Sequence, residues 1–232
     1  MSVSIIIPAY NEEKNLNSAV KGALWAVKDT VSDYELIIVD DGSVDRTHWV
    51  ANKFARKNRK IKVIHHIKNI GFGSTFKDGI RNACKDYLVG FPGDYDTSEK
   101  SLRDLIKKAS SADLIMTYNP DMSTRTWARR LFSKSFIMMM NQLFGLRLKY
   151  YNGSFICKTK LLKNLKLVSG GFAIYAEAKV RLLHNGLSYE EIPFKYLGRK
   201  FGKSKAVSIN SVLQTLETMF ILINDIKLKK DK

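Results

Sequence analysis

Apolar residues in the first half of the chain follow two alternating patterns. Short β-branched or aliphatic runs, such as 3–7, stop at turn residues and predict buried strands. Between these runs, apolar residues recur every three or four positions, as over 16–27, and predict amphipathic helices. The expected strands cover 3–8, 35–39, 61–64, 87–91 and 113–117, with a helix after each of the first four. This alternation predicts an α/β fold, a mostly parallel mixed sheet flanked by helices.

Helix starts in this half are predicted from polar residues near the first apolar position of each helix. Asn11 is the expected N-cap of the first helix, with Glu12 and Glu13 in its first turn. Ser43 or Asp45 is the expected cap of the second helix.

The second half of the chain is more helical and more basic. Helices are expected over 125–144, 171–184 and 209–223, with a strand over 188–193. The first of these places Arg125, Arg129, Arg130 and Lys134 on one side, next to a Met-rich apolar segment over 136–144. That composition fits an interfacial amphipathic helix and equally a core helix with a solvated charged face. No linker interrupts the chain, so we expect one domain over 1–205 and a C-terminal amphipathic helix with a basic tail over 206–232.

The net charge changes this picture, because +17 over 232 residues implies an anionic partner. Nucleic acid, an anionic membrane surface and phosphorylated substrates all satisfy that condition. No apolar stretch reaches the ~20 residues that span a bilayer, and we expect no signal peptide, because the chain enters a strand without a basic region or cleavage site. Cys84 and Cys157 lack metal-ligand spacing and are expected to be reduced, buried thiols. The predicted location is therefore cytoplasmic, with peripheral membrane association.

Acidic residues follow several of the predicted strands. Asp94 and Asp96 come directly after the run 87–91, at the strand end where open α/β sheets bind ligands. Two carboxylates there suit a divalent cation (Mg²⁺ or Mn²⁺) that also holds a diphosphate, although a solvated acidic turn is the simpler alternative. Acidic strand ends would repel nucleic acid, so that partner is excluded. The Gly71-x-Gly73 pair is no dinucleotide fingerprint, because Phe76 replaces the third glycine.

Taken together, the motifs resemble those of the GT-A glycosyltransferases of family 2. The segments that carry the resemblance are V-S-I-I-I-P-A-Y-N-E-E over 3–13, I-V-D-D-G-S-V-D-R-T over 38–47, and Asn69-x-Gly71 with Gly79. E-I-P over 191–193 and R-x-x-G-x-S-K over 199–205 are similar to the branch of dolichyl-phosphate mannose synthase and the polyprenyl-phosphate sugar transferases. The resemblance extends to about residue 205.

This resemblance implies a binding site for a GDP- or UDP-linked sugar. Its donor-binding residues would be Pro8, Tyr10, Glu12, Asp41, Asn69, Lys77 and Asp94. The metal ligand would be Asp94, which belongs to the site in either alignment register, with Asp96 as a second candidate. The chain departs from the family where Pro92 stands in place of the first Asp of the family D-x-D, so a catalytically weak relative is an alternative.

The implied reaction is an inverting transfer of the sugar to a polyprenyl phosphate. Such an acceptor needs cations rather than a general base, since it is already anionic. The residues implied for the acceptor phosphate or the diphosphate are Arg129, Arg130, Lys134, Arg199, Ser204 and Lys205. Glu177 stands where many relatives carry their base; we expect it to orient the acceptor or support the cations, with a structural helix acid as the alternative. A relative that glycosylates a hydroxyl would need Glu177 as its base.

Overall fold

The computed structural model describes residues 1–121, 127–199, 201 and 209–228. Strands and helices alternate along this range, except that two helices stand between the last two strands. The strands are β1 (Ser2–Ala9), β2 (Asp33–Asp40), β3 (Ile61–His65), β4 (Tyr87–Gly90), β5 (Leu114–Tyr118), β6 (Phe155–Lys158) and β7 (Tyr189–Pro193). The helices are α1 (Leu16–Val27), α2 (Thr47–Lys57), α3 (Phe72–Asn82), α4 (Glu99–Lys107), α5 (Trp127–Phe144), α6 (Thr159–Lys163), α7 (Ile174–His184) and α8 (Ile209–Ile223), followed by a π-helical turn (Asn224–Leu228).

The strands form one seven-stranded sheet in the order β3-β2-β1-β4-β6-β5-β7. All neighbouring pairs are parallel except those of β6, which runs antiparallel to both β4 and β5. The predicted mixed, mostly parallel sheet is therefore confirmed. The strand β6 was not predicted from the sequence.

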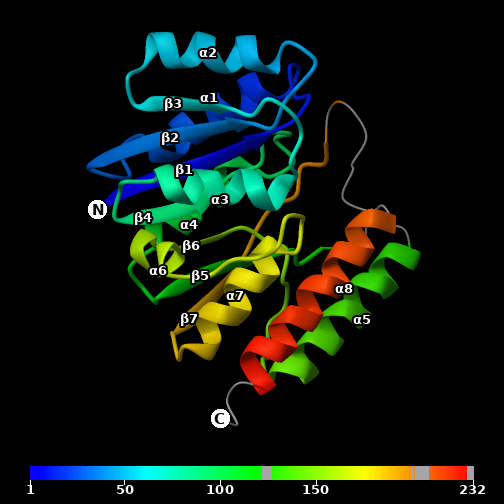
Figure 1. Cartoon of the computed structure of the whole chain (residues 1–232). Coiled ribbons are helices and arrows are strands. Elements are labelled where there is room, and N and C mark those ends of the chain that lie inside the picture. The colour runs from blue at the N-terminus through cyan, green and yellow to red at the C-terminus, as the bar shows by residue number, and fades with distance from the viewer. Residues whose placement is uncertain (122–126, 200, 202–208, 229–232) are drawn as a thin grey trace.

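Helices cover both faces of the sheet (Figure 1). Alternate residues of β1 point to opposite faces, so Ile5 and Ile7 pack in one hydrophobic cluster with α1 and α4, while Ile6 packs in another with α3 and α7. The second cluster also contains Met219 and Leu222 of α8. The C-terminal helix therefore packs against the same core as the rest of the chain.

The helix α5 combines the two characters that its sequence left open. Met140 and Phe144 are buried in the core, whereas Met138 is 67% exposed. Figure 1 shows α5 and α8 to one side of the sheet, away from its β3 edge. No helix in the described part of the chain is both long enough and apolar enough to cross a membrane.

Three local predictions were wrong. The first helix begins at Leu16 with Asn15 at its N-cap, because Asn11 has a positive φ of 56° and its side chain accepts from the Val44 amide instead. Glu12 and Glu13 therefore precede that helix. The second helix has Arg46 at its N-cap, although Asp45 Oδ1 does accept from the Thr47 amide at 2.9 Å. Of the two cysteines, Cys157 is buried but Cys84 is exposed.

Candidate active site

The loops after β1, β2 and β4 meet at the carboxyl edge of the sheet. The amide of Asp41 donates to the Ala9 carbonyl at 2.9 Å, and the amide of Gly93 donates to the Pro8 carbonyl at 3.2 Å. A Cβ on Gly93 would lie only 2.4 Å from that carbonyl oxygen, so only glycine allows this approach. The structure thus brings the three predicted acidic strand ends together around the end of β1.

Asp41 holds the loop between β3 and α3. One carboxylate oxygen accepts from the backbone amide of Ile70 at 2.9 Å. The other accepts from the backbone amide of Gly71 at 3.0 Å and from the side-chain Nδ2 of Asn69 at 2.8 Å. His66 Nδ1 lies 2.8 Å from the first oxygen. These contacts use about four acceptor positions, the capacity of a carboxylate. Asp41 and Asn69 therefore order this loop at the carboxyl edge of the sheet.

His66 is a site residue that the sequence analysis missed. Its Nε2 lies 3.0 Å from Asp78 Oδ2, so the imidazole bridges Asp41 to α3. A polar residue at the carboxyl end of β3 was the available signal, since every other site loop follows a parallel strand in the same way.

Glu12 and Asp94 converge on Arg199. One guanidinium nitrogen of Arg199 contacts Glu12 Oε1, and another lies 3.4 Å from Asp94 Oδ2. The Arg199 Nε donates to the Phe201 carbonyl at 2.6 Å, and the Asn15 side chain donates to the same oxygen at 3.2 Å. A residue of the R-x-x-G-x-S-K segment therefore lies directly on the predicted donor carboxylates.

Burial changes the pKa of Glu12 and of Asp94. Desolvation is the largest influence on each and raises the pKa of Glu12 and of Asp94 above the usual value. Opposing this, the Asn15 hydrogen bond and the Arg199 charge lower the pKa of Glu12, and Arg199 likewise lowers that of Asp94. A positive charge at this position therefore stabilises both carboxylates.

The oxygen ligands at this position suit Mg²⁺ or Mn²⁺, which are held by one or two carboxylates together with substrate phosphates. Asp94 and Glu12 already direct oxygens at one cation, the guanidinium. Among the described residues, no group of three or more His, Cys, Asp or Glu side chains is arranged to hold a metal. Asp96 accepts from the Thr97 hydroxyl at 3.0 Å, while its amide lies 3.4 Å from Asp94 Oδ1. The remaining ligands of such an ion would be water or the oxygens of a bound phosphate.

Glu177 is fully buried and holds the segment before α7. Its carboxylate accepts from the amides of Val168 and Ser169 at 2.9 and 2.8 Å, and Arg181 Nε donates to it at 2.9 Å. Lys77 Nζ lies 3.4 Å from the Val168 carbonyl. Because the Glu177 side chain is 0% exposed, it cannot touch a substrate in this arrangement. The geometry matches the structural alternative for Glu177 and associates Lys77 with the same segment.

The other predicted residues lie in less constrained places. Pro8 is buried near the end of β1, and Tyr10 is half-buried just after it. Arg130 and Lys134 are exposed on α5; Arg129 also lies in α5, but its side chain is outside the described part of the structure. Ser204 and Lys205 lie outside the described residues, as does Arg125.

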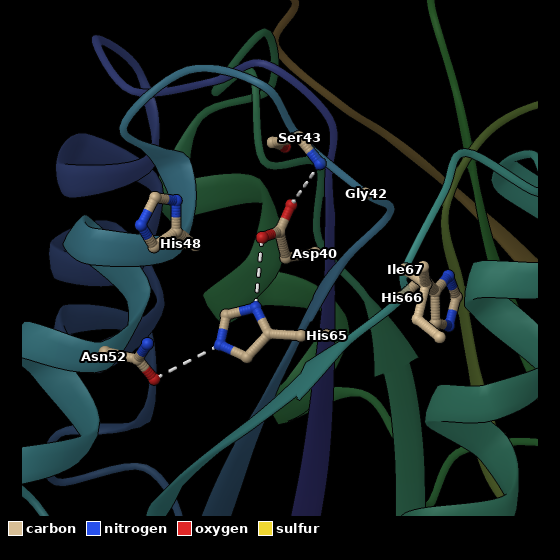
Figure 2. Close-up of a pocket in the computed structure, with 8 residues that line it drawn as sticks. All are labelled: Asp40, Gly42, Ser43, His48, Asn52, His65, His66 and Ile67. Carbon is tan, nitrogen blue, oxygen red and sulfur yellow. Dashed lines mark hydrogen bonds and ion pairs between the residues drawn. The ribbon is translucent and has the colours of Figure 1, made fainter.

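A shallow pocket of about 300 Å³ opens next to Asp41, between α2 and the ends of β2 and β3. Figure 2 shows His48, Asn52 and His65 on one side of it and His66 and Ile67 on the other. His65 Nδ1 lies 3.1 Å from Asp40 Oδ2, and Asp40 Oδ1 accepts from the Ser43 amide at 3.1 Å. None of the predicted site residues lines this pocket, although it borders the D-D-G-S segment.

Two proteins of similar sequence carry names from the predicted branch. The chain is 29% identical over 217 residues to the dolichol-phosphate mannosyltransferase of Pyrococcus furiosus, a match covering 88% of this chain and 59% of that protein. It is 37% identical over 118 residues to human dolichyl-phosphate beta-glucosyltransferase, covering 44% of this chain and 36% of the relative. The chain thus spans little more than half the length of the first of these relatives, and less of the second.

Solved structures share the fold at low sequence identity. Glucosyl-3-phosphoglycerate synthase from Mycobacterium tuberculosis, in complex with phosphoglyceric acid, superposes with a TM-score of 0.70 at 17% identity and covers 95% of this chain and 79% of that one. The same enzyme with Mn²⁺, UDP and glucosyl-3-phosphoglycerate gives 0.68 at 15% identity, covering 97% and 80%. The model of the family "Glycosyl transferase family 2" matches residues 4–180. With its GT-A fold and its three motif-bearing strand ends gathered at one edge, this chain belongs to glycosyl transferase family 2.

Proposed function

We propose that the protein transfers a sugar from a nucleotide-sugar donor to a polyprenyl phosphate, with inversion, at a membrane surface. One observation carries this proposal. Arg199 comes from the segment that marks the polyprenyl-phosphate branch, and it contacts Glu12 and Asp94 of the donor motifs. This contact supports a single site that combines Arg199 of the branch-specific segment with the donor carboxylates. The names of the relatives support the same acceptor class.

In this proposal, the carboxylates of Asp94 and, next to it, Glu12 or Asp96 hold Mg²⁺ or Mn²⁺. When bound, the ion would neutralise the negative charge that develops on the leaving diphosphate. The loop ordered by Asp41 and Asn69, together with Pro8 and Tyr10, borders the nucleoside. In the same proposal, Arg199 acts together with Lys205, Arg130 and Lys134 to hold phosphate in position against charge repulsion.

The burial of Glu177 favours a phosphate acceptor over a hydroxyl acceptor. A sugar hydroxyl needs a general base within hydrogen-bond reach. Glu177, the candidate for that role, is enclosed, and its oxygens accept from two backbone amides and Arg181. A phosphate is already anionic and needs no such base, so a positioning role for Glu177 through the 168–169 segment is consistent with the proposed acceptor.

The two outer helices supply the proposed membrane contact. The exposed side of α5 carries Trp127, Leu131 and Met138 at helical spacing, with exposed Arg130 and Lys134 on the same helix. The exposed side of α8 carries Leu213, Leu216 and Phe220. Exposed apolar side chains of this size beside cations are typical of helices that lie in a membrane interface. An anionic bilayer satisfies both features and the net charge.

Vesicle co-sedimentation tests the membrane contact separately from catalysis. Binding to anionic vesicles should weaken as salt rises, because each interfacial cation contributes about 1 kcal/mol. Replacing Leu131 and Phe220 with Ser should weaken binding further, whereas Val44→Ser, at an exposed apolar position in the loop after β2, should not. Equal binding to neutral vesicles, or no binding to either kind, would contradict the proposed contact.

The acceptor is tested by product analysis with a panel of UDP- and GDP-linked sugars and Mg²⁺ or Mn²⁺. A lipid-linked sugar should form only when polyprenyl phosphate is present, and EDTA should prevent its formation. Faster transfer to a sugar or polysaccharide hydroxyl would replace the proposal with the hydroxyl-acceptor reaction. Absence of transfer and of donor hydrolysis in all combinations would indicate a catalytically weak relative.

A further inference from the structure

We propose that Arg199 is an exchangeable cation that occupies the donor carboxylates until a divalent metal displaces it. The inference rests on the proposed function, because it concerns the same carboxylates. It assigns Arg199 two successive partners: first Glu12 and Asp94, then a phosphate. Metal loading and the holding of phosphate would thereby be coupled through one side chain.

The contacts of Arg199 place its charge between two acids from distant parts of the chain. Its guanidinium contacts Glu12 Oε1 and lies 3.4 Å from Asp94 Oδ2. The three side chains are only 18%, 7% and 23% exposed, so solvent screens these interactions weakly. Glu12 precedes α1, Asp94 follows β4 and Arg199 follows β7. The guanidinium is therefore the positive charge that joins these segments at the site.

A divalent metal bound at Asp94 Oδ2 would lie beside the Arg199 guanidinium that now contacts this oxygen, and the two cations would repel each other. The single charge of Arg199 balances only half the charge of the two ionised carboxylates, whereas a divalent cation balances all of it. Mg²⁺ and Mn²⁺ also prefer the hard oxygen ligands that carboxylates provide. The metal is therefore the better partner for Asp94, and its binding must release at least one arm of Arg199.

The released guanidinium then has a new anionic partner. Arginine binds phosphate with two parallel N–H···O bonds, a geometry that matches both a diphosphate and a phosphate monoester. The turn that carries Arg199 stays near the site, because the Asn15 side chain donates to the Phe201 carbonyl at 3.2 Å. Rotation of the Arg199 side chain would thus move its charge from the carboxylates to a phosphate. In this proposal, Arg199 binds phosphate only after the metal has bound.

A Mn²⁺ titration followed by electron paramagnetic resonance of the free ion tests the exchange without turnover or nucleotide. Arg199→Gln should bind Mn²⁺ about tenfold more tightly than wild type, since a competing charge near the ion is removed. Arg199→Lys, which keeps the charge but cannot bridge both acids, should fall between the two. Arg56→Gln is the matched control: Arg56 is exposed on α2, and its loss changes the net charge equally. Its affinity should stay within about twofold of wild type.

Equal or weaker Mn²⁺ binding by Arg199→Gln and Arg199→Lys would overturn the exchange and make Arg199 a permanent structural ion pair. The same result follows if Arg56→Gln tightens binding as much as Arg199→Gln. Asp94→Asn separates this failure from that of the proposed function. If Asp94→Asn binds Mn²⁺ as wild type does, the assignment of the metal to Asp94 fails whatever the Arg199 variants do. Thermal melting of each variant confirms that it is folded.

Discussion

Two groups of acids stand at the same edge of the sheet but are held in different ways. Asp41 accepts hydrogen bonds from the amides of Ile70 and Gly71 and from the side chain of Asn69, all within the loop it organises. Glu12 and Asp94 instead share a side chain, Arg199, from more than a hundred residues away. Backbone amides cannot leave a folded loop, whereas a guanidinium can rotate away. Asp41 is therefore held by its own loop, whereas Glu12 and Asp94 are held by a side chain that can move.

The largest expected effect is that of Asp94→Asn on transfer. Loss of the carboxylate removes the proposed metal ligand, and transfer should fall by at least about a hundredfold, or roughly 2.7 kcal/mol. Stability should change by no more than about 1 kcal/mol, because the raised pKa of Asp94 shows that burial already disfavours its charge. Assays of transfer and thermal unfolding measure both.

Asp96→Asn is the comparison variant, because Asp96 is the second candidate metal ligand and has a separate contact to Thr97. It should retain more activity than Asp94→Asn. If Asp96→Asn abolishes transfer while Asp94→Asn does not, the metal ligand has been assigned to the wrong carboxylate.

Asp41→Asn, unlike Asp94→Asn, should cause a marked loss of stability. An Asn side chain can accept at only one atom, so some of the donors from Asn69, Ile70, Gly71 and His66 lose their partner. At about 1.5–3 kcal/mol for a hydrogen bond to a charged group, the free energy of unfolding should fall by about 2–4 kcal/mol. Denaturant unfolding measures this change. A stability equal to that of wild type would show that Asp41 does not build the loop.

Arg199→Ala and Lys205→Ala should each slow transfer to polyprenyl phosphate by at least about tenfold, or 1.4 kcal/mol. The physical reason is the loss of one cation from a desolvated phosphate site. Initial rates at saturating donor measure the effect, and Arg56→Ala, exposed on α2, serves as the control. Wild-type rates in both variants would contradict a role for Arg199 and Lys205 in binding the acceptor.

The last prediction is a pH dependence of stability that arises away from both groups of acids. Lys179 lies on the buried side of α7 with Nζ 3.3 Å from the Tyr150 carbonyl, and burial lowers its pKa to about 7. The unfolded chain therefore binds a proton that the folded chain does not between about pH 7 and the usual lysine value of about 10.4. Over that window stability should rise with pH, by no more than about 1.4 kcal/mol per unit. Lys179→Met should remove the rise in urea unfolding series; an unchanged slope would contradict the assignment to Lys179.

The first half of the chain, from β1 to β4, was predicted well from the sequence, because its parallel strands are compact apolar runs that end in polar motifs. The loops that follow β1, β2 and β4 fall where those motifs placed them. The start of α1 was misplaced, since Asn11 bonds across to the loop after β2 rather than to its own helix. A contact between segments 33 residues apart carries no local signal.

The second half was less predictable for physical reasons. The strand β6 is only four residues long, lies between two strands and has no polar alternation, so its sequence does not distinguish it from a loop or a short helix. Lys179 appears in the sequence as an ordinary helix cation, although it is completely buried. The pairing of Arg199 with Glu12 joins residues 187 positions apart and depends on the whole sheet being assembled.

A crystal structure with Mn²⁺ and a nucleoside diphosphate, with the anomalous signal of the metal recorded, tests the central comparison most directly. We expect one anomalous peak at the Asp94 carboxylate, with Arg199 moved from Glu12 and Asp94 to a phosphate oxygen. The contacts of Asp41 with Asn69, Ile70 and Gly71 should remain as they are. A Mn²⁺ peak elsewhere, with Arg199 still on Glu12 and Asp94 or with Asp41 itself turned to the metal, would contradict the distinction between the two groups of acids.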